Sequence, residues 1–153
     1  MRRLKFLVML SALALLPLSA VRAQVGISFW AGYAQSSDSG AAKLDTKGIQ
    51  AAAQLALPLV PIAFRAEATQ WGTSINMDHL NVIGSGVVQL RLPLLQIYGI
   101  AGYGRFAETD STTLKGWAAG GGVRLGQGRF GLFGEVRRFD VVARTVTTLG
   151  ITF

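Results

Sequence analysis

Apolar residues occupy every second position through most of this chain, and this period of two constrains its fold more than any other feature. In residues 24–35, for example, Ile27 and Phe29 fall on one side of an extended backbone, and Ser28 and Trp30 fall on the other. Side chains of a β-strand alternate between two faces in this way, whereas a helix repeats its apolar residues every three or four positions. The pattern predicts eight strands, at residues 24–35, 48–57, 62–72, 80–92, 95–103, 117–125, 130–137 and 144–153.

The chain is apolar overall, yet it has no long apolar segment after its N-terminus. Hydrophobic residues make up 50% of the sequence and charged residues 15%, and 19 residues are glycine. A membrane-spanning helix needs roughly 20 consecutive apolar residues, whereas tilted strands of about 10 residues are long enough to cross a bilayer. We therefore expect an all-β fold, an eight-stranded antiparallel up-and-down transmembrane β-barrel.

The predicted connections alternate in length. Three are longer and polar, at residues 36–47, 73–79 and 107–115. The three between them are tight and rich in proline or glycine, at residues 57–61, 92–94 and 126–129. Long loops on one side and short turns on the other are typical of outer-membrane barrels. The last connection, at residues 140–143, is short and fits this scheme less well.

The first 23 residues have the organisation of a secretory signal peptide. Arg2, Arg3 and Lys5 precede an apolar run of about 11 residues, too short for a membrane anchor, and small residues lead to Ala23. We expect cleavage after Ala23, which leaves residues 24–153 as one barrel domain. Cleavage removes four basic residues and no acidic one, so the formal charge falls from +7 to +3. The chain has no cluster of Lys or Arg and therefore lacks the basic surface expected of a nucleic-acid-binding protein.

Aromatic residues on the apolar face fall into two predicted girdles when the strands are threaded up and down from a periplasmic N-terminus. Such girdles flank the lipid-facing band of outer-membrane barrels. The outer girdle contains Tyr33, Tyr103 and Trp117. The periplasmic girdle contains Phe64, Phe130 and Phe153, and Phe29 alone falls at mid-height.

The last six residues, Thr148-Leu149-Gly150-Ile151-Thr152-Phe153, alternate apolar side chains and end on an aromatic one. Together with the presequence and the eight amphipathic segments, this ending resembles the small outer-membrane barrels typified by OmpX and the OmpA membrane domain. The stretch GLFGEVRR at residues 131–138 is similar to the penultimate strand of that group. The resemblance implies that Leu149, Ile151 and Phe153 form the signal read by the outer-membrane assembly machinery.

Charged residues of the predicted strands fall on the face opposite the apolar one. We assign to the lumen a polar network of Arg65, Glu67, Gln89, Arg91, Arg124, Glu135 and Arg137, with Gln50, Gln54, Ser85 and Gln96 beside it. An eight-stranded barrel is only wide enough for its own side chains, so we interpret the network as ion pairs that fill the interior. Four arginines against two glutamates leave an excess of positive charge, and a narrow, weakly anion-preferring conduit therefore stays an alternative.

Few residues suggest catalytic chemistry. Some eight-stranded outer-membrane barrels are lipid A-modifying enzymes that use serine, histidine and an acid, and Ser74, Asp78 and His79 lie close together here. Asp78 and His79 are neighbours, however, and side chains of neighbours on an extended strand point to opposite faces. A single histidine without cysteine does not supply a typical metal site. We expect no enzyme, and no catalytic, cofactor-binding or metal-binding residues.

Other candidate binding features are weak. Trp30, Trp71 and Tyr98 fall on the inner face, where we interpret them as packing residues, although they could also line a small apolar pocket. The predicted loop at residues 35–47 is polar and lacks an aromatic anchor of the kind that dominates binding energy. The sequence does not identify an extracellular partner.

The sequence thus predicts an integral outer-membrane barrel with a structural or surface-interaction role, in contact with membrane lipid and lipopolysaccharide. One alternative is a soluble periplasmic lipocalin-like barrel that binds an apolar ligand inside. In that case Arg65, Glu67, Glu135 and Arg137 would face water, because the two faces would be inverted. The lipid A-modifying enzyme is the second alternative.

Overall fold

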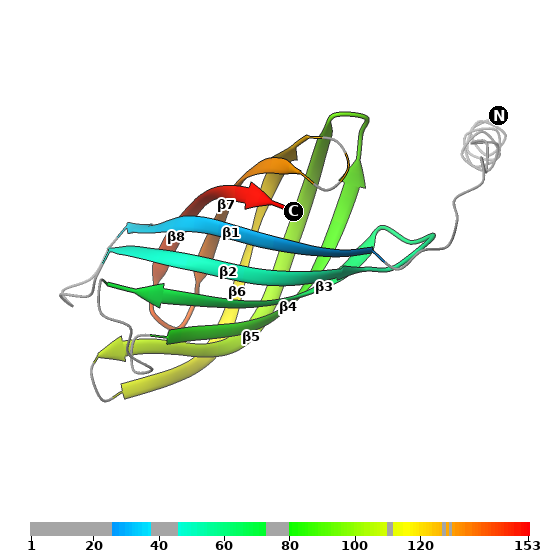
Figure 1. Ribbon diagram of the computed structural model, residues 1–153. Helices are drawn as coiled ribbons and strands as arrows, with labels where there is room; N and C mark the ends of the chain where they lie inside the picture. The colour runs from blue at the N-terminus through cyan, green and yellow to red at the C-terminus, as the bar shows by residue number, and fades with distance from the viewer. Residues whose placement is uncertain (1–25, 38–45, 73–79, 110–111, 127, 129) are drawn as a thin grey trace, which may run out of the picture.

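The computed structural model describes residues 26–37, 46–72, 80–109, 112–126, 128 and 130–153, and they form one barrel (Figure 1). The predicted signal peptide lies outside these residues. In chain order the strands are β1 (Gly26–Ser37), β2 (Lys47–Ala56), β3 (Ile62–Trp71), β4 (Leu80–Arg91), β5 (Leu95–Thr109), β6 (Thr112–Leu125), β7 (Gly131–Phe139) and β8 (Arg144–Thr152). Among the described residues, no helix has the length and apolar character needed to span a bilayer.

The wall closes on itself through the first and last strands. Each strand pairs antiparallel with its neighbours in sequence, and β1 also pairs with β8. At the end of this seam, Phe29 N–H donates to the Phe153 carbonyl at 2.7 Å, and Phe153 N–H donates back to the Phe29 carbonyl at 2.9 Å. A closed barrel pairs backbone groups within the wall and leaves no free strand edge, as a hydrocarbon environment requires. The predicted eight-stranded antiparallel up-and-down barrel is confirmed.

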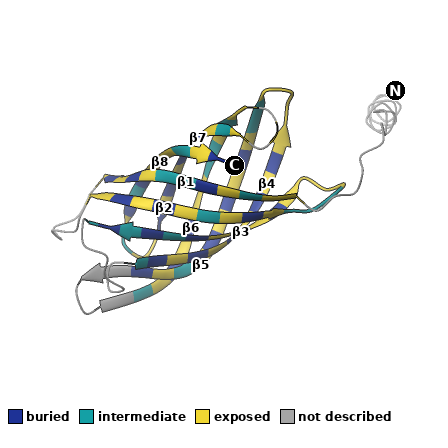
Figure 2. Cartoon of the chain, in the orientation of Figure 1, coloured by how far each residue is buried: buried dark blue, intermediate teal, exposed yellow. Residues whose placement is uncertain are grey.

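Burial alternates along much of the wall, as Figure 2 shows by bands of contrasting colour. On β3, for example, Phe64 is 56% exposed and the next residue, Arg65, is 3% exposed. The same contrast separates outward Val136 from inward Arg137 on β7. Because successive side chains of a strand point to opposite faces, the large apolar residues cover the outside of the barrel and most charged residues of the wall turn inward.

The two ends of the barrel differ in their connections. At one end of the barrel, here called the turn end, successive strands are joined by residues 57–61, 92–94 and 126–130. Strand β1 begins and strand β8 ends at this same end. These turns are tight: Leu57 N–H donates to the Ile62 carbonyl at 3.0 Å, and Leu92 N–H donates to the Leu95 carbonyl at 2.8 Å. At the opposite end, the loop end, lie the connections after β1, β3, β5 and β7.

The prediction of a third long loop, at residues 107–115, is wrong. Strands β5 and β6 continue through it and pair Arg105 with Lys115 and Thr109 with Thr112, with a register shift between Ala107 and Thr109. The segment contains consecutive threonines, whose β-branched side chains favour extended backbone, so its polarity did not mark a loop. The predicted loop at residues 36–47 is also shorter than expected, because β1 extends to Ser37 and β2 begins at Lys47.

Candidate functional site: the barrel interior and its two ends

Four charged side chains meet at mid-height inside the barrel. Arg65 on β3 donates from Nη1 to Oε2 of Glu135 on β7 at 2.7 Å. Arg137, two residues along β7, donates from Nε to Oε1 of Glu135 and from both Nη atoms to the carboxylate of Glu67. Two cations and two anions therefore balance in what we call the ionic centre, residues Arg65, Glu67, Glu135 and Arg137. All four are at most 4% exposed.

Neutral side chains occupy the remaining hydrogen-bonding positions of the ionic centre. Tyr98 on β5 donates its hydroxyl to Oε2 of Glu135 at 2.9 Å, and Gln54 on β2 accepts from Nε and Nη2 of Arg65 at 3.0 and 2.8 Å. The Arg65 guanidinium also lies over the Trp30 ring, 3.9 Å from its centroid. A buried charge is costly unless it is paired and hydrogen-bonded, and both conditions are met here. The arrangement holds its side chains in fixed geometry and leaves no free acid or base.

Glycines of β6 make room for the ionic centre. Gly120 pairs with Arg137 and Gly122 pairs with Glu135 across the wall. A Cβ atom at Gly120 would lie 2.7 Å from the Arg137 Cα, and one at Gly122 would lie 2.6 Å from the Tyr98 hydroxyl. Side chains on this stretch of β6 would therefore collide with the network, which explains its run of small residues.

Two apolar clusters enclose the ionic centre, and most of their members were not predicted from the sequence. The cluster toward the loop end, which we call the plug, contains Ala34, Trp71, Ile83, Phe106, Ala118, Phe139 and Val146. The cluster toward the turn end contains Trp30, Ala63, Val87, Tyr98, Ile100 and Phe133. Strand β4 shows why they were missed: it is apolar at Ile83 and Val87 as well as on its outer face, so alternation of polarity is weak there. Close packing of these residues opposes the alternative of a hydrated conduit.

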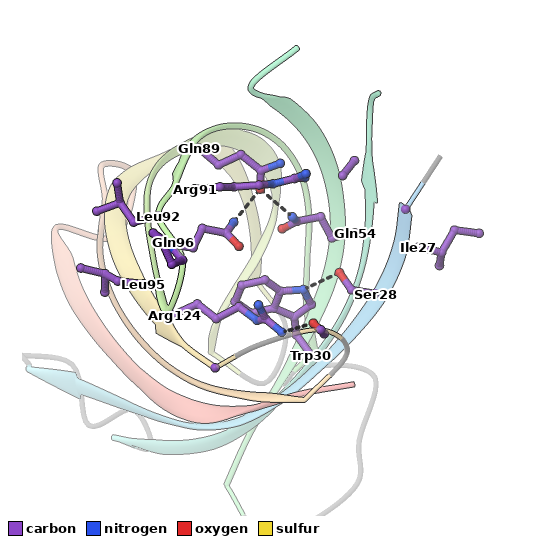
Figure 3. A pocket seen from close by; sticks show the side chains of 15 residues that line it. Ile27, Ser28, Trp30, Gln54, Gln89, Arg91, Leu92, Leu95, Gln96 and Arg124 are labelled. Atoms are coloured by element: carbon purple, nitrogen blue, oxygen red, sulfur yellow. Dashed lines mark hydrogen bonds between the residues drawn. The ribbon is translucent and has the colours of Figure 1, made fainter. Parts of the chain in front are cut away.

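The other two arginines assigned to the lumen lie apart from the ionic centre, at the turn end. Arg91 is the last residue of β4 and Arg124 lies next to the end of β6. Both line an open pocket of about 550 Å³, with Gln89, Gln96 and Gln54 (Figure 3). The excess positive charge expected inside the lumen is therefore located at this mouth, where solvent reaches it. Arg91 and Arg124 thus lie inside the barrel but apart from the four charged residues of the ionic centre.

Glutamines link the mouth to the interior. Gln89 Oε1 accepts from Nε2 of Gln96 and, at 3.4 Å, from Nε2 of Gln54, which also binds Arg65 (Figure 3). Turning the Gln89 amide over would instead offer its oxygen to Arg91. Arg124 donates from Nε to Thr152 Oγ1 at 2.7 Å and from Nη2 to the Gly128 carbonyl at 2.9 Å. The rim of the mouth is therefore polar and hydrogen-bonded, and rotation of the Gln89 amide can exchange a donor for an acceptor within it.

The aromatic residues assigned to girdles all lie on the outside of the wall. Tyr33, Phe64, Tyr103, Trp117, Phe130 and Phe153 are each at least 46% exposed. Tyr103 and Trp117 are direct partners across β5 and β6, with ring centroids 5.4 Å apart. Phe29, expected at mid-height, instead stacks on the terminal Phe153 with centroids 6.1 Å apart. Phe29 therefore belongs with the aromatic residues of the turn end.

The C-terminal strand presents its apolar residues outward. Leu149 and Ile151 are 64% and 52% exposed, and Phe153 lies at the turn end of the seam between β8 and β1. Inward residues of the same strand, Thr148 and Thr152, are buried. The residues of the proposed assembly signal thus form one outer stripe beside the seam.

Several candidates lie outside the described residues. Ser74, Asp78 and His79, the possible catalytic set, are among them, as is most of the predicted loop at residues 35–47. Within the described part of the chain, no group of three or more His, Cys, Asp or Glu side chains could hold a metal ion. Trp30, Trp71 and Tyr98 are buried inside the barrel, and all three are members of the apolar clusters.

No family model and no curated protein matches this chain. Among solved structures it is similar to Ail, the attachment invasion locus protein of Yersinia pestis, in complex with the heparin analogue sucrose octasulfate. The identity is 21%, the TM-score is 0.52, and the match covers 85% of this chain and 99% of Ail. It is also similar to Neisserial surface protein A (NspA), with 15% identity, a TM-score of 0.50 and coverage of 82% and 92%. These likenesses show that the chain shares the fold of these proteins along nearly their whole length.

Proposed function

We propose that this chain is an integral outer-membrane barrel, exported by the signal peptide of residues 1–23, with a structural or surface-interaction role and a lumen filled by its own side chains. The observation that carries this proposal is the inversion of its surfaces. Large apolar residues from every strand are exposed on the outer wall, while the ionic centre is buried inside. A soluble protein rarely exposes an apolar patch larger than a few hundred Å², whereas a lipid-embedded wall requires one.

The soluble lipocalin-like alternative needs the opposite arrangement. Its interior would be apolar and empty enough for a ligand, and its charged residues would face water. Here Glu67 and Arg137 bind each other inside, and Ile27, Val88 and Leu149 are each more than 60% exposed. The turn-end pocket is lined by two arginines and three glutamines beside its apolar residues, and is not the purely apolar interior that such a binder needs. The inverted surfaces therefore favour the membrane-embedded barrel.

Exposed cations on the outer wall near the loop end support an orientation with that end toward the cell exterior. Lys47, Arg105, Lys115 and Arg138 are exposed and point outward, and we call them the basic collar. Arg105 and Lys115 are direct cross-strand partners close to Tyr103 and Trp117. Like charges directly opposite each other destabilise a sheet, and a phosphate between them would remove that cost. Lipopolysaccharide carries phosphates at the level of such a collar, so we propose it as the lipid partner.

The complex of Ail with a heparin analogue suggests a second ligand class for this end of the barrel. A sulfated saccharide presents the same kind of oxyanion as lipopolysaccharide phosphate, and the basic collar suits both chemically. Asp140, which follows β7 at the same end, carries the opposite charge and would limit affinity for either. Lipopolysaccharide is the stronger proposal because the collar adjoins the apolar outer wall.

The proposal is tested by expressing the chain with its own signal peptide in a Gram-negative host. We expect the protein in the outer-membrane fraction, shortened by removal of residues 1–23, and migrating differently on gels before and after boiling. Heat-modifiable mobility reports a closed barrel that resists detergent until it is heated. Recovery in the soluble periplasm without a mobility shift would contradict the proposal and favour the lipocalin-like barrel.

The assembly signal is tested separately by deletion of Phe153. The deletion removes the terminal aromatic and its two backbone bonds to Phe29, so we expect less barrel in the outer membrane and more unfolded protein in the periplasm. Secretion and signal-peptide removal should be unchanged, as the size of the periplasmic form would show. Phe130→Ala, which also removes an exposed aromatic at the turn end, is the control. Equal assembly of both variants would argue against a terminal signal.

A further inference from the structure

Two neighbouring turns at the turn end contain only leucine, valine and proline. The connection after β2 reads LPLVP at residues 57–61, and the connection after β4 reads LPL at residues 92–94. The first turn adjoins β4, because Gln89 N–H donates to the Pro61 carbonyl at 2.8 Å. Turns are dominated by Gly, Pro, Asn, Asp and Ser, so large apolar side chains at both of these connections need a separate explanation.

The side chains that these turns present are exposed, as Figure 2 shows for both connections. Leu59, Val60 and Leu94 are 71%, 43% and 62% exposed, and we call these three residues the turn tips. Leu59 also has a φ of 68°, a left-handed conformation that costs a leucine more than a glycine or an asparagine. Folding alone favours Gly or Asn at this position, so the exposed leucine indicates a contact outside the barrel.

The turn tips continue the apolar outer wall. Outward Ile62 and Phe64 follow the first turn on β3, and outward Val88 and Leu90 precede the second turn on β4. Phe64 belongs to the aromatic girdle, and such girdles lie at the boundary between lipid and water. Beyond this girdle, however, the chain stays apolar through Ile62 to the tips. The surface suited to lipid therefore extends past the level at which a barrel wall normally becomes polar.

Charge distinguishes these turns from the opposite end of the wall. The outer wall ends in the basic collar at the loop end, whereas residues 57–61 and 92–94 contain no charged residue. The third turn, residues 126–130, contains an arginine and a glutamine in the sequence, so the apolar tips are confined to the side of β2–β5. Protein interfaces have a polar rim, and on the wall side the tips have none. Lipid hydrocarbon is the occupant that this continuity favours.

We propose that the turn tips are inserted into the lipid of the adjacent leaflet, so that the barrel ends within the membrane on the side of β2–β5. This inference rests on the proposed function, because it requires the outer wall to lie in lipid. The leaflet is the periplasmic one if the loop end faces the cell exterior. The apolar band is then displaced toward the turn end, and the polar part of the wall projects into water only at the loop end.

Site-directed spin labelling tests the depth of the tips directly. The chain has no cysteine, so Leu59→Cys and Leu94→Cys each give a single attachment site for a nitroxide. Each labelled mature chain is folded into phosphatidylcholine vesicles, and its accessibility to oxygen, which enters lipid, is compared with accessibility to a nickel chelate, which stays in water. We expect a ratio close to that of Val88→Cys on the outer wall, and several-fold above that of exposed Asp140→Cys at the loop end.

The wall position separates failure of this inference from failure of the proposed function. A Val88 label in lipid with both tip labels in water would leave the membrane barrel standing and overturn the insertion of the tips, which a soluble partner would then have to cover. A Val88 label that is also in water would overturn both. Val60→Cys replaces Leu59→Cys if that variant does not form a closed barrel, which heat-modifiable mobility shows. The Asp140 label controls for attraction of the nitroxide itself to lipid.

Discussion

The two ends of this barrel have the same alternating wall but differ in how the lumen is filled and in where their cations point. At the loop end, an apolar plug fills the lumen, Phe106 is fully buried, and the cations Arg105 and Lys115 point outward. At the turn end, the lumen opens into a polar pocket, and the cations Arg91 and Arg124 point inward. A strand assigns a face to each residue, but the residue's height along the barrel determines what surrounds it. Exposed cations therefore lie on the outer surface at the loop end, where Arg144 is buried inside, whereas the cations of the turn end line its pocket.

The largest effect is expected in the ionic centre that separates the two ends. Arg137→Met should reduce the free energy of unfolding by about 3–5 kcal/mol, because Glu67 would lose its buried partner and Glu135 one of two. Arg138→Met, one residue along β7 but exposed, should change it by less than about 0.5 kcal/mol. Urea unfolding in detergent, followed by tryptophan fluorescence, measures both. Equal effects would mean that the centre contributes nothing beyond surface charge.

A comparable loss of stability is expected when a residue of the plug is truncated. If no such loss is measured, the contrast between a filled loop end and an open turn end does not hold. Phe106→Ala should cost about 3–5 kcal/mol, since the cavity left at a fully buried position cannot collapse in a closed wall. Leu92→Ala, at the rim of the open mouth, should cost less than about 1 kcal/mol, because water already reaches this side chain. The same unfolding assay compares the two. A small loss for Phe106→Ala would show that the loop end is loosely filled.

The lipid-facing band between the ends is tested by moving a charge along one strand. Ala66 points outward on β3 near the middle of the wall, and Ala66→Arg should destabilise the barrel in bilayers by about 2–4 kcal/mol. Gln70→Arg, on the same face but next to the loop end, should cost only about 0–1 kcal/mol, because the arginine reaches the interface. Reversible unfolding from lipid vesicles gives both values. Equal costs at the two heights would contradict the membrane span.

The smallest effect on stability is expected in the basic collar, and its sign is informative. Lys115→Gln should raise the stability in pure detergent by up to about 0.5 kcal/mol, because it removes a like-charge pair with Arg105. The same change should weaken binding of lipopolysaccharide, which co-purification with the folded barrel can quantify. Arg91→Gln, whose charge lies inside the opposite end, is the control. A loss of stability without lipopolysaccharide would mean that Lys115 has another partner.

Period two was sufficient to predict the strands and the closed barrel, because face assignment needs only local sequence. It placed Arg65 and Glu67 on one face, and both are buried inside. It could not separate Arg91 from Arg65, since both point inward and only cross-strand register shows that Arg91 shares a rung with Arg124. Inward apolar residues such as Ile83 were not predicted for a related reason. Where a strand is apolar on both faces, polarity does not alternate and cannot indicate which residues point inward.

The error at residues 107–115 has a different physical origin. Polar composition was taken to indicate a loop, but a hairpin that extends beyond the apolar band needs polar residues on both faces. Thr112 and Thr113 pair with Thr109 and Ala107 in continuous strands. In barrels of this kind, composition indicates where the apolar band ends, whereas β-propensity indicates where the strand ends.

The seam between β1 and β8 has a consequence for how the protein is made. The strand synthesised first finds its second partner only in the strand synthesised last, and the final bonds join Phe29 to the terminal residue Phe153. A chain that lacks β8 cannot close the wall, so a barrel exported as proposed would travel with its apolar stripes unpaired until β8 is present. Contacts this distant in sequence also form slowly, which prolongs the interval during which strands from different molecules could associate. If the chain is exported as proposed, we therefore expect it to depend on a partner that shields it during transit, rather than on early folding, for protection against aggregation.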